Sequence, residues 1–397
     1  MKSFEITYFH GPFAEYIVRD DVVKNIAESG MTLVPLHYDV KTNLAALPLL
    51  RRYGLKALVG DSRIYGVYGG NRIEDADQTV REIVSAYTDF DDVIIGWDLV
   101  DEPNSSRFAV LGALVAAFRK YSPDKETMIN LFPNYASPEQ LGNPTYADHL
   151  EDFVRQVNPH CLSYDHYHFL GREGRNQLEL GEVDERERLI RLSAEQTADR
   201  GGFFDNIEVV REKALKFGLD AMLIVLLTEH GPYRNLTFGE LLWEANMCLA
   251  YGMKRLSFFT YWEPSHDDFW QWTNAMADTE GNLTQHYYDV QRIAASLKGV
   301  GECLFDKTCR AVFHIGEPEP GARAFAPYGG IDAIEGEDGV IGFFDDGVLY
   351  LVNRSYRGAN RFTLHGASLE RWDNGVWTSC GNEFALEAGE GVLLRRV

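Results

Sequence analysis

Two glutamates in this sequence have the surroundings that acid–base and nucleophilic chemistry requires. Glu102 lies in the segment 96–104 (GWDLVDEPN) and Glu229 in the segment 227–231 (LTEHG), each directly after an apolar run. Hydrolysis of a glycosidic bond needs such a pair, because one carboxyl group protonates the leaving oxygen while the other attacks the sugar or activates water. The two glutamates are 127 positions apart in the chain, so only the fold can bring them together.

Eight short apolar runs supply the elements that could position these residues. They alternate with helical patterns and cover residues 4–9, 31–36, 55–59, 93–99, 127–132, 161–164, 221–227 and 255–259. Most are apolar throughout, which is typical of parallel strands that are buried on both faces. Gly30, Gly54 and Gly218 stand where helices should end, and Thr237 with Glu240 forms a capping box. The sequence therefore predicts a (β/α)8 (TIM) barrel over residues 1–302, with its active site at the carboxyl ends of the strands.

The pattern changes near residue 300. From residue 311 onward, short alternating runs such as 347–352, 361–364 and 391–394 are separated by Gly, Asp and Asn. No helical period is evident there. We expect a small C-terminal antiparallel β domain, resembling a β-sandwich, over residues 303–397.

The segment Asp101-Glu102-Pro103-Asn104, together with a glutamate after the seventh run, resembles the clan of (β/α)8 retaining glycoside hydrolases known as clan GH-A or 4/7 hydrolases. The resemblance covers residues 4–300 and implies that Glu102 is the acid/base, that Glu229 is the nucleophile and that the anomeric configuration is retained. The usual motif of the clan is Asn-Glu-Pro, whereas this chain has Asp101 in the first position. Asp101 can still accept a hydrogen bond from the sugar 2-hydroxyl. Its charge and that of Glu229 should raise the pKa of Glu102.

Other strand ends carry residue types that suit sugars, which are bound by planar hydrogen-bonding groups and aromatic faces. The resemblance implies that Trp262 forms the floor of the −1 subsite and that Tyr167 or His166 contacts the nucleophile. Tyr8, His37, Arg63 and Asn134 are further candidates for substrate binding. Glu263, after the eighth run, is a rival to Glu229 as the nucleophile.

Two alternatives remain open. His10, His37, His166, His168 and His230 fall near strand ends and could serve a metal-dependent sugar isomerase or hydrolase. Their spacing is not that of a typical metal site, so we expect neither a metal nor another cofactor. A non-catalytic carbohydrate-binding barrel would keep the aromatic residues but would lose a carboxylate.

The composition of the chain disfavours some classes of binding partner. The formal net charge of −22 disfavours nucleic acids and anionic lipid surfaces. Five cysteines without a CxxC pair, no apolar stretch near 18 residues and no apolar leader indicate a soluble, cytoplasmic protein. A carbohydrate is the expected partner, and the β domain could also be an interface of a homo-oligomer.

Loop lengths bear on the mode of cleavage. The polar segment 171–202 should form a long loop after the sixth strand, and the glycine-rich segment 66–70 a flexible loop after the third. Such loops would close one end of the groove. We therefore expect exo action on small β-linked oligosaccharides or glycosides.

Overall fold

The computed structural model describes residues 4–170, 176–178, 189–191, 199–266, 270–373 and 375–397. Eight parallel strands form one sheet in the order β1-β11-β9-β6-β5-β4-β3-β2. The backbone amide of Thr32 donates to the carbonyl of Ile6 at 2.9 Å, so the two edge strands also meet. The strands are β1 (Glu5–Tyr8), β2 (Leu33–Leu36), β3 (Lys56–Gly60), β4 (Ile94–Asp101), β5 (Glu126–Leu131), β6 (Cys161–Asp165), β9 (Asp220–Leu226) and β11 (Arg255–Phe259). Each coincides with one of the eight apolar runs, and the predicted (β/α)8 barrel is confirmed.

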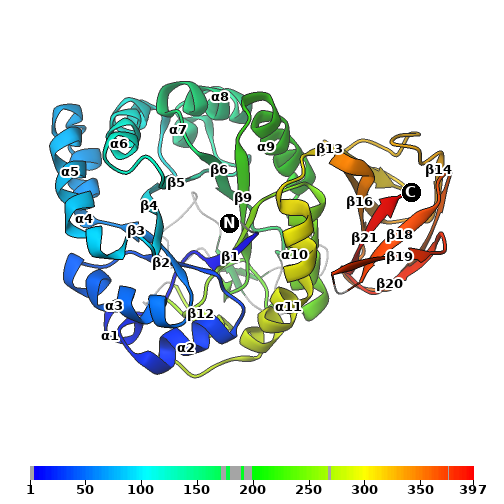
Figure 1. The fold of residues 1–397 in the computed structure, drawn as a ribbon, viewed down its shortest axis with the longest axis horizontal. Coiled ribbons are helices and arrows are strands. Elements are labelled where there is room, and N and C mark those ends of the chain that lie inside the picture. The colour runs from blue at the N-terminus through cyan, green and yellow to red at the C-terminus, as the bar shows by residue number, and fades with distance from the viewer. Residues whose placement is uncertain (1–3, 171–175, 179–188, 192–198, 267–269, 374) are drawn as a thin grey trace.

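Helices surround the strands as an outer ring (Figure 1). The longer ones are α2 (Asp20–Glu28), α3 (Val40–Arg52), α4 (Ser62–Gly69), α5 (Ala76–Ala86), α6 (Phe108–Tyr121), α8 (Tyr146–Val157), α9 (Phe203–Phe217), α10 (Phe238–Ala250) and α11 (Gln285–Phe305). Two single-turn helices, α1 (Ala14–Ile17) and α7 (Pro138–Leu141), lie in connections. The capping box of Thr237 and Glu240 begins α10, as the sequence predicts.

One expected loop is a helix instead. The glycine-rich segment 66–70 lies almost entirely within α4, whose first turn is capped by the side chain of Asp61. Ile64 and Val67 are buried on one face of this helix, and their packing outweighs the low helix propensity of glycine. The other expected loop, within 171–202, falls largely outside the described residues. Of that segment, the structure describes the antiparallel pair β7 (Asn176–Leu178) and β8 (Leu189–Arg191).

The C-terminal part contains two antiparallel sheets. The larger has the order β13-β15-β16-β21-β18-β19 and the smaller β14-β17-β20. Their strands are β13 (Cys309–Ile315), β14 (Ala333–Glu335), β15 (Gly339–Phe344), β16 (Val348–Asn353), β17 (Asn360–His365), β18 (Leu369–Asp373), β19 (Val376–Cys380), β20 (Glu383–Leu386) and β21 (Gly391–Arg396). An apolar cluster that includes Phe343, Leu351, Phe362 and Leu364 joins residues of both sheets.

This C-terminal unit packs beside α9 and α10 of the barrel (Figure 1). The hydroxyl of Tyr350 donates to Oδ1 of Asn246 at 2.6 Å, and the Asn246 amide donates to the carbonyl of Gly389 at 2.7 Å. Gly342 lies against α10 so closely that a Cβ there would be 2.2 Å from the carbonyl oxygen of Ala250. The contact therefore requires glycine at this position.

Within the part of the chain that the structure describes, no helix combines the length and apolar character needed to cross a membrane.

Candidate active site

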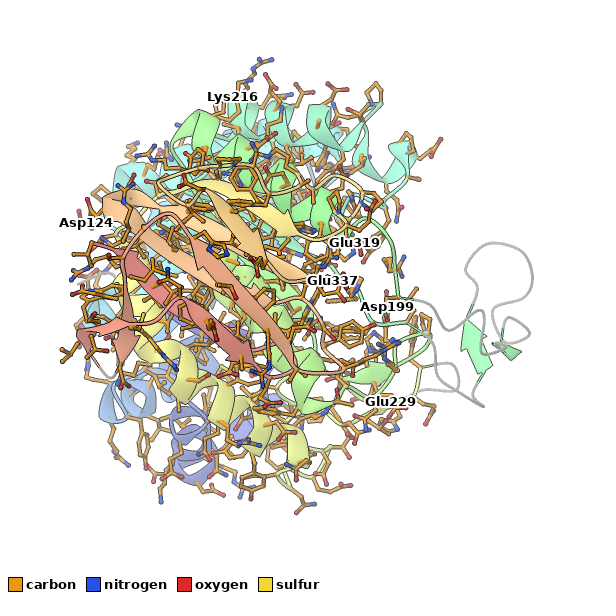
Figure 2. The ribbon with its side chains drawn as sticks, turned by 90° about the vertical axis from the view of Figure 1, so that its right-hand side faces the viewer. Asp124, Asp199, Lys216, Glu229, Glu319 and Glu337 are labelled. Atoms are coloured by element: carbon orange, nitrogen blue, oxygen red, sulfur yellow. The ribbon has the colours of Figure 1, made fainter. Side chains whose placement is uncertain are left out.

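Three acidic residues mark the carboxyl end of the barrel: Glu102 follows β4, Asp165 ends β6 and Glu229 follows β9. In Figure 2, Glu229 lies on the side of the molecule away from Asp124, a residue that precedes β5 and so marks the opposite end of the barrel. This is the end at which (β/α)8 enzymes place their active sites.

The side chain of Glu102 is hydrogen-bonded to that of Asp165. Its backbone adopts a φ of 44°, and its amide donates to the carbonyl of Asn130 on β5 at 2.9 Å. Burial raises the pKa of Glu102 well above that of an ordinary glutamate, and the charges of Asp165 and Asp101 raise it further. We expected Asp101 and Glu229 to be the charges responsible. Asp101 does contribute, but Asp165 contributes more.

Asn130 ties the acidic residues of neighbouring strands together. Its side-chain amide donates to Oδ1 of Asp101 at 3.0 Å and to Oδ1 of Asp165 at 2.9 Å. The hydroxyl of Ser163 donates to Asn130 Oδ1 at 3.1 Å, and the two carboxylate acceptors fix the orientation of the amide. Asn130 was not among the site residues predicted from the sequence, because it stands inside an apolar strand. A polar side chain in such a run is the signal that could have revealed it.

Glu229 is held in a two-stranded antiparallel sheet. The strand β10 (Glu229–His230) pairs with β12 (Trp272–Thr273) in antiparallel fashion. Oε2 of Glu229 accepts hydrogen bonds from the Thr273 hydroxyl at 3.0 Å and from the Asn274 side-chain amide at 2.6 Å. Both donors hold this oxygen in place.

The rival Glu263 has a different environment. Its carboxyl group accepts hydrogen bonds from the backbone amides of Asn274 and Ala275, and Oε2 lies 3.8 Å from Nε2 of His266. Burial raises the pKa of Glu263. These contacts hold the loop that carries Asn274, and Asn274 in turn holds Glu229.

Aromatic side chains surround Glu229. The rings of Trp270 and Trp272 stack with their centroids 5.6 Å apart. The ring centroid of His230 lies 4.4 Å from that of Trp272. Tyr167, one of the predicted site residues, packs edge to face against Tyr233, with ring centroids 5.4 Å apart. Both tryptophans are half-buried, so part of each ring faces solvent. The sequence analysis did not single them out, although a Trp-x-Trp pattern after the eighth strand was visible.

His37 lies at the barrel mouth, as expected of a site residue, and its Nε2 is 2.9 Å from Oδ2 of Asp98. Burial lowers the pKa of His37, but the Asp98 carboxylate outweighs it, so that the pKa is raised overall. Arg63 is paired with Asp61 through two hydrogen bonds of 2.8 and 2.7 Å. The guanidinium group of Arg63 is thus hydrogen-bonded to Asp61, two residues earlier in the chain.

Four predicted substrate-binding residues are placed differently from the expectation. Trp262 and Tyr8 are each 1% exposed, and Trp262 packs against Tyr16 of α1 at 4.8 Å. His166 is fully buried, with Nδ1 3.1 Å from Oδ1 of Asn206. The amide of Asn134 donates to Gly202 and Asp205 near the start of α9. Trp262, Tyr8 and His166 are thus buried between elements, and their roles in substrate binding remain predictions.

The histidines near strand ends have separate partners. Nδ1 of His168 contacts the carbonyl of Arg200 at 2.8 Å, and Nδ1 of His230 contacts that of Thr228 at 2.7 Å. Over the described ranges, no three His, Cys, Asp or Glu side chains are grouped so that they could hold a metal ion.

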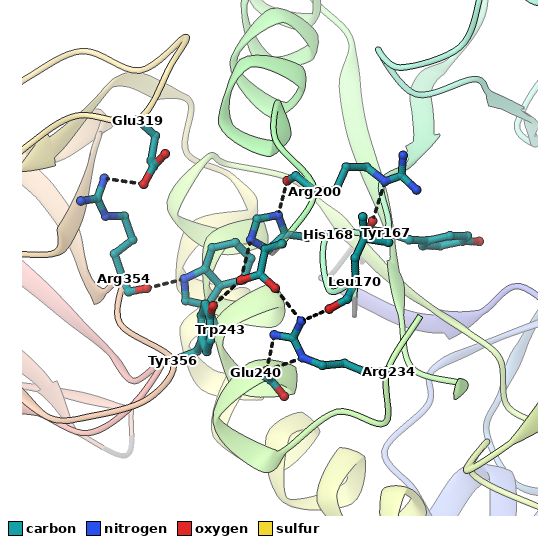
Figure 3. A network of polar contacts seen from close by, with 11 residues as sticks. Tyr167, His168, Leu170, Arg200, Arg234, Glu240, Trp243, Glu319, Arg354 and Tyr356 are labelled. Carbon is teal, nitrogen blue, oxygen red and sulfur yellow. Dashed lines mark hydrogen bonds and ion pairs between the residues drawn. The ribbon is translucent and has the colours of Figure 1, made fainter. Parts of the chain in front are cut away.

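A polar network joins the C-terminal unit to Tyr167 and Tyr233, two of the aromatic residues near Glu229 (Figure 3). Tyr356 donates to Asp199, which also pairs with Arg234 at 2.6 Å. The adjacent Arg200 donates to the carbonyl of Tyr167 and to the hydroxyl of Tyr233, both at 3.2 Å. A cavity of about 390 Å³ lies beside this network, between the barrel and the C-terminal unit.

No protein-family model matches the sequence, and no curated protein matches it. Solved structures resemble the fold. A β-galactosidase from Bacillus circulans sp. alkalophilus superposes with a TM-score of 0.64 at 9% identity, covering 100% of this chain and 99% of the other. A catalytic mutant of a GH42 β-galactosidase from G. stearothermophilus also gives 0.64, at 7% identity and the same coverage.

A β-galactosidase from the psychrophilic Marinomonas ef1 gives a TM-score of 0.51 at 11% identity over 75% of this chain, which spans 60% of that longer protein. At these identities the likeness establishes the fold. The chain has the (β/α)8 architecture of solved β-galactosidases, as the resemblance to the 4/7 hydrolases predicts.

Proposed function

We propose that the protein is a retaining glycoside hydrolase in which Glu102 is the acid/base and Glu229 the nucleophile. The observation that carries the proposal is the contrast between two glutamates at the carboxyl end of the barrel. Burial and neighbouring charge favour the protonated form of Glu102, whereas Glu229 accepts hydrogen bonds from two side-chain donors. A proton donor and a carboxylate are the two groups that double displacement requires.

Glu229 would attack the anomeric carbon while Glu102 protonates the glycosidic oxygen, and the bond between sugar and leaving group breaks. Water would then attack the glycosyl-enzyme, giving its proton to Glu102 and releasing Glu229 as a carboxylate. The half-buried rings of Trp270 and Trp272 offer faces on which a sugar can stack.

The substrate class that we propose is a small β-linked oligosaccharide or glycoside, cleaved from one end. The fold shared with solved β-galactosidases makes β-galactosides the first candidates. Product analysis on a β-linked tetrasaccharide separates the two modes of cleavage, because exo action releases one terminal unit at a time.

The test is hydrolysis of a panel of 4-nitrophenyl glycosides by the wild type, Glu229→Ala and the matched variant Glu263→Ala, with and without azide. We expect Glu229→Ala to lose activity and azide to restore it, yielding a glycosyl azide of inverted configuration. The same azide product from Glu263→Ala would move the nucleophile to Glu263. Activity that requires an added divalent metal would favour the metal-dependent alternative. Binding of the panel without cleavage would favour a non-catalytic barrel.

A further inference from the structure

Asp165 occupies a position that double displacement by two glutamates does not by itself explain. It is 6% exposed at the end of β6, and its carboxylate contacts the Glu102 carboxyl group. A buried carboxylate is costly, so a second carboxyl group beside it needs a proton. The pair thus shares a proton at the site where the proposed acid must hold one.

Asn130 determines how the pair is arranged. Its amide donates to Asp165 Oδ1 at 2.9 Å, and the Asp165 side chain also contacts the Glu102 carboxyl group. Because both partners of the Asn130 side-chain NH2 group are carboxylate oxygens, those of Asp101 and Asp165, a reversed amide would place its own oxygen against two acceptors. Asn130 can only donate to Asp165, so Asp165 is the acceptor and Glu102 the donor of the shared proton.

We propose that Asp165, oriented by Asn130, is a positioning residue that keeps Glu102 protonated and directs its carboxyl group in the free enzyme. This inference rests on the proposed function. In the first step Glu102 gives its proton to the leaving oxygen, which keeps the electron pair of the broken bond. In the second step Glu102 regains a proton from water as the water oxygen bonds to the anomeric carbon. Burial and the charge of Asp101 raise the pKa of Asp165 as well, to about 7, so Asp165 is the ionised member of the pair while Glu102 holds the shared proton.

Other charged groups face this pair and contribute to its titration. Asp101 lies beside it on β4, and Arg200, which precedes α9, partly offsets the charge of Asp165. Asp101 itself faces Asp98 and His37. The hydroxyl groups of Tyr135, Tyr146, Tyr167 and Tyr233 also face Asp165. Burial raises the pKa of each tyrosine, so all four stay neutral in the working range.

The experiment is a titration of the Glu102 carboxyl carbon by 13C NMR in protein labelled at glutamate δ-carbons, with the resonance assigned by its loss in Glu102→Gln. Asp165→Asn keeps the shape and removes the charge. We expect the Glu102 midpoint to fall by about one to two pH units in this variant, because a like charge is removed. Asp165→Glu, which restores the charge, should bring it back up. Asp77→Asn, which removes a carboxylate exposed on α5, should leave it unchanged.

Kinetics supply a second readout. With phenyl β-galactoside, whose leaving group needs protonation, the alkaline limb of kcat/KM should move to lower pH in Asp165→Asn by the same amount. With 2,4-dinitrophenyl β-galactoside, which needs no acid, it should not move. An unmoved Glu102 titration in Asp165→Asn overturns the inference alone. If Glu102→Gln cleaves phenyl and dinitrophenyl glycosides as the wild type does, the proposed acid role of Glu102 fails instead.

Discussion

The side-chain amide of Asn274 donates a hydrogen bond of 2.6 Å to Oε2 of Glu229. The same oxygen accepts from the hydroxyl of Thr273 at 3.0 Å. Two donors on one oxygen hold the carboxylate in a single orientation. The loop after β11 therefore positions a residue that follows β9.

Removing the Asn274 amide should slow the reaction. Asn274 has a φ of 62°, so Asn274→Gly is the appropriate variant, because alanine would add backbone strain. A hydrogen bond to a charged group contributes about 1.5–3 kcal/mol, so kcat/KM should fall by about 10–150-fold. Asn71→Gly, at an exposed position with a φ of 51°, is the matched control and should retain wild-type kinetics. Equal activity of both variants would show that Asn274 does not hold Glu229.

Trp270 and Trp262 should respond differently to truncation. Trp270 is half-buried beside Trp272, so Trp270→Ala should raise KM about tenfold, equivalent to about 1.4 kcal/mol of binding, with little change in Tm. Trp262 is 1% exposed, so Trp262→Ala should instead lower the free energy of unfolding by about 3–5 kcal/mol. Steady-state kinetics and urea unfolding distinguish the two. A raised KM at wild-type stability in Trp262→Ala would restore the subsite role that the sequence predicted.

Glu244 on α10 should make stability depend on pH. Its side chain is fully buried, and burial, followed by the charge of Glu240, raises its pKa well above the usual value of 4.5. In the unfolded chain Glu244 loses its proton near pH 4.5, whereas in the folded protein it keeps the proton. The contribution of Glu244 to the free energy of unfolding is therefore fully present below pH 4.5 and is lost as pH rises toward the folded-state pKa.

Glu244→Gln removes this dependence. We expect it to unfold at wild-type urea concentrations at pH 4 and to be more stable than the wild type at pH 7, by about 1.4 kcal/mol for each pH unit above 4.5 over which the folded wild type still holds the proton. Glu337→Gln, on an exposed turn, serves as the control. A difference between Glu244→Gln and the wild type that is constant from pH 4 to pH 7 would contradict the prediction.

The barrel strands could be predicted from the sequence because a strand that is buried on both faces consists mostly of apolar residues. Each of the eight runs became a barrel strand, and the alternating runs 347–352, 361–364 and 391–394 became β16, β17 and β21. Segment 66–70 was misjudged because local glycine content favours a loop, whereas the burial of Ile64 and Val67 favours a helix.

The sequence by itself determined the barrel and placed Glu102 and Glu229 after strands, because periodicity and strand ends are local properties of a chain. Only the tertiary structure decided their neighbours. Asp165 is 63 positions from Glu102, and it meets that residue because β4, β5 and β6 are adjacent in the sheet. The burial of Trp262 beneath α1 was decided in the same way. Contacts between distant segments and exclusion from water depend on packing, which no local pattern records.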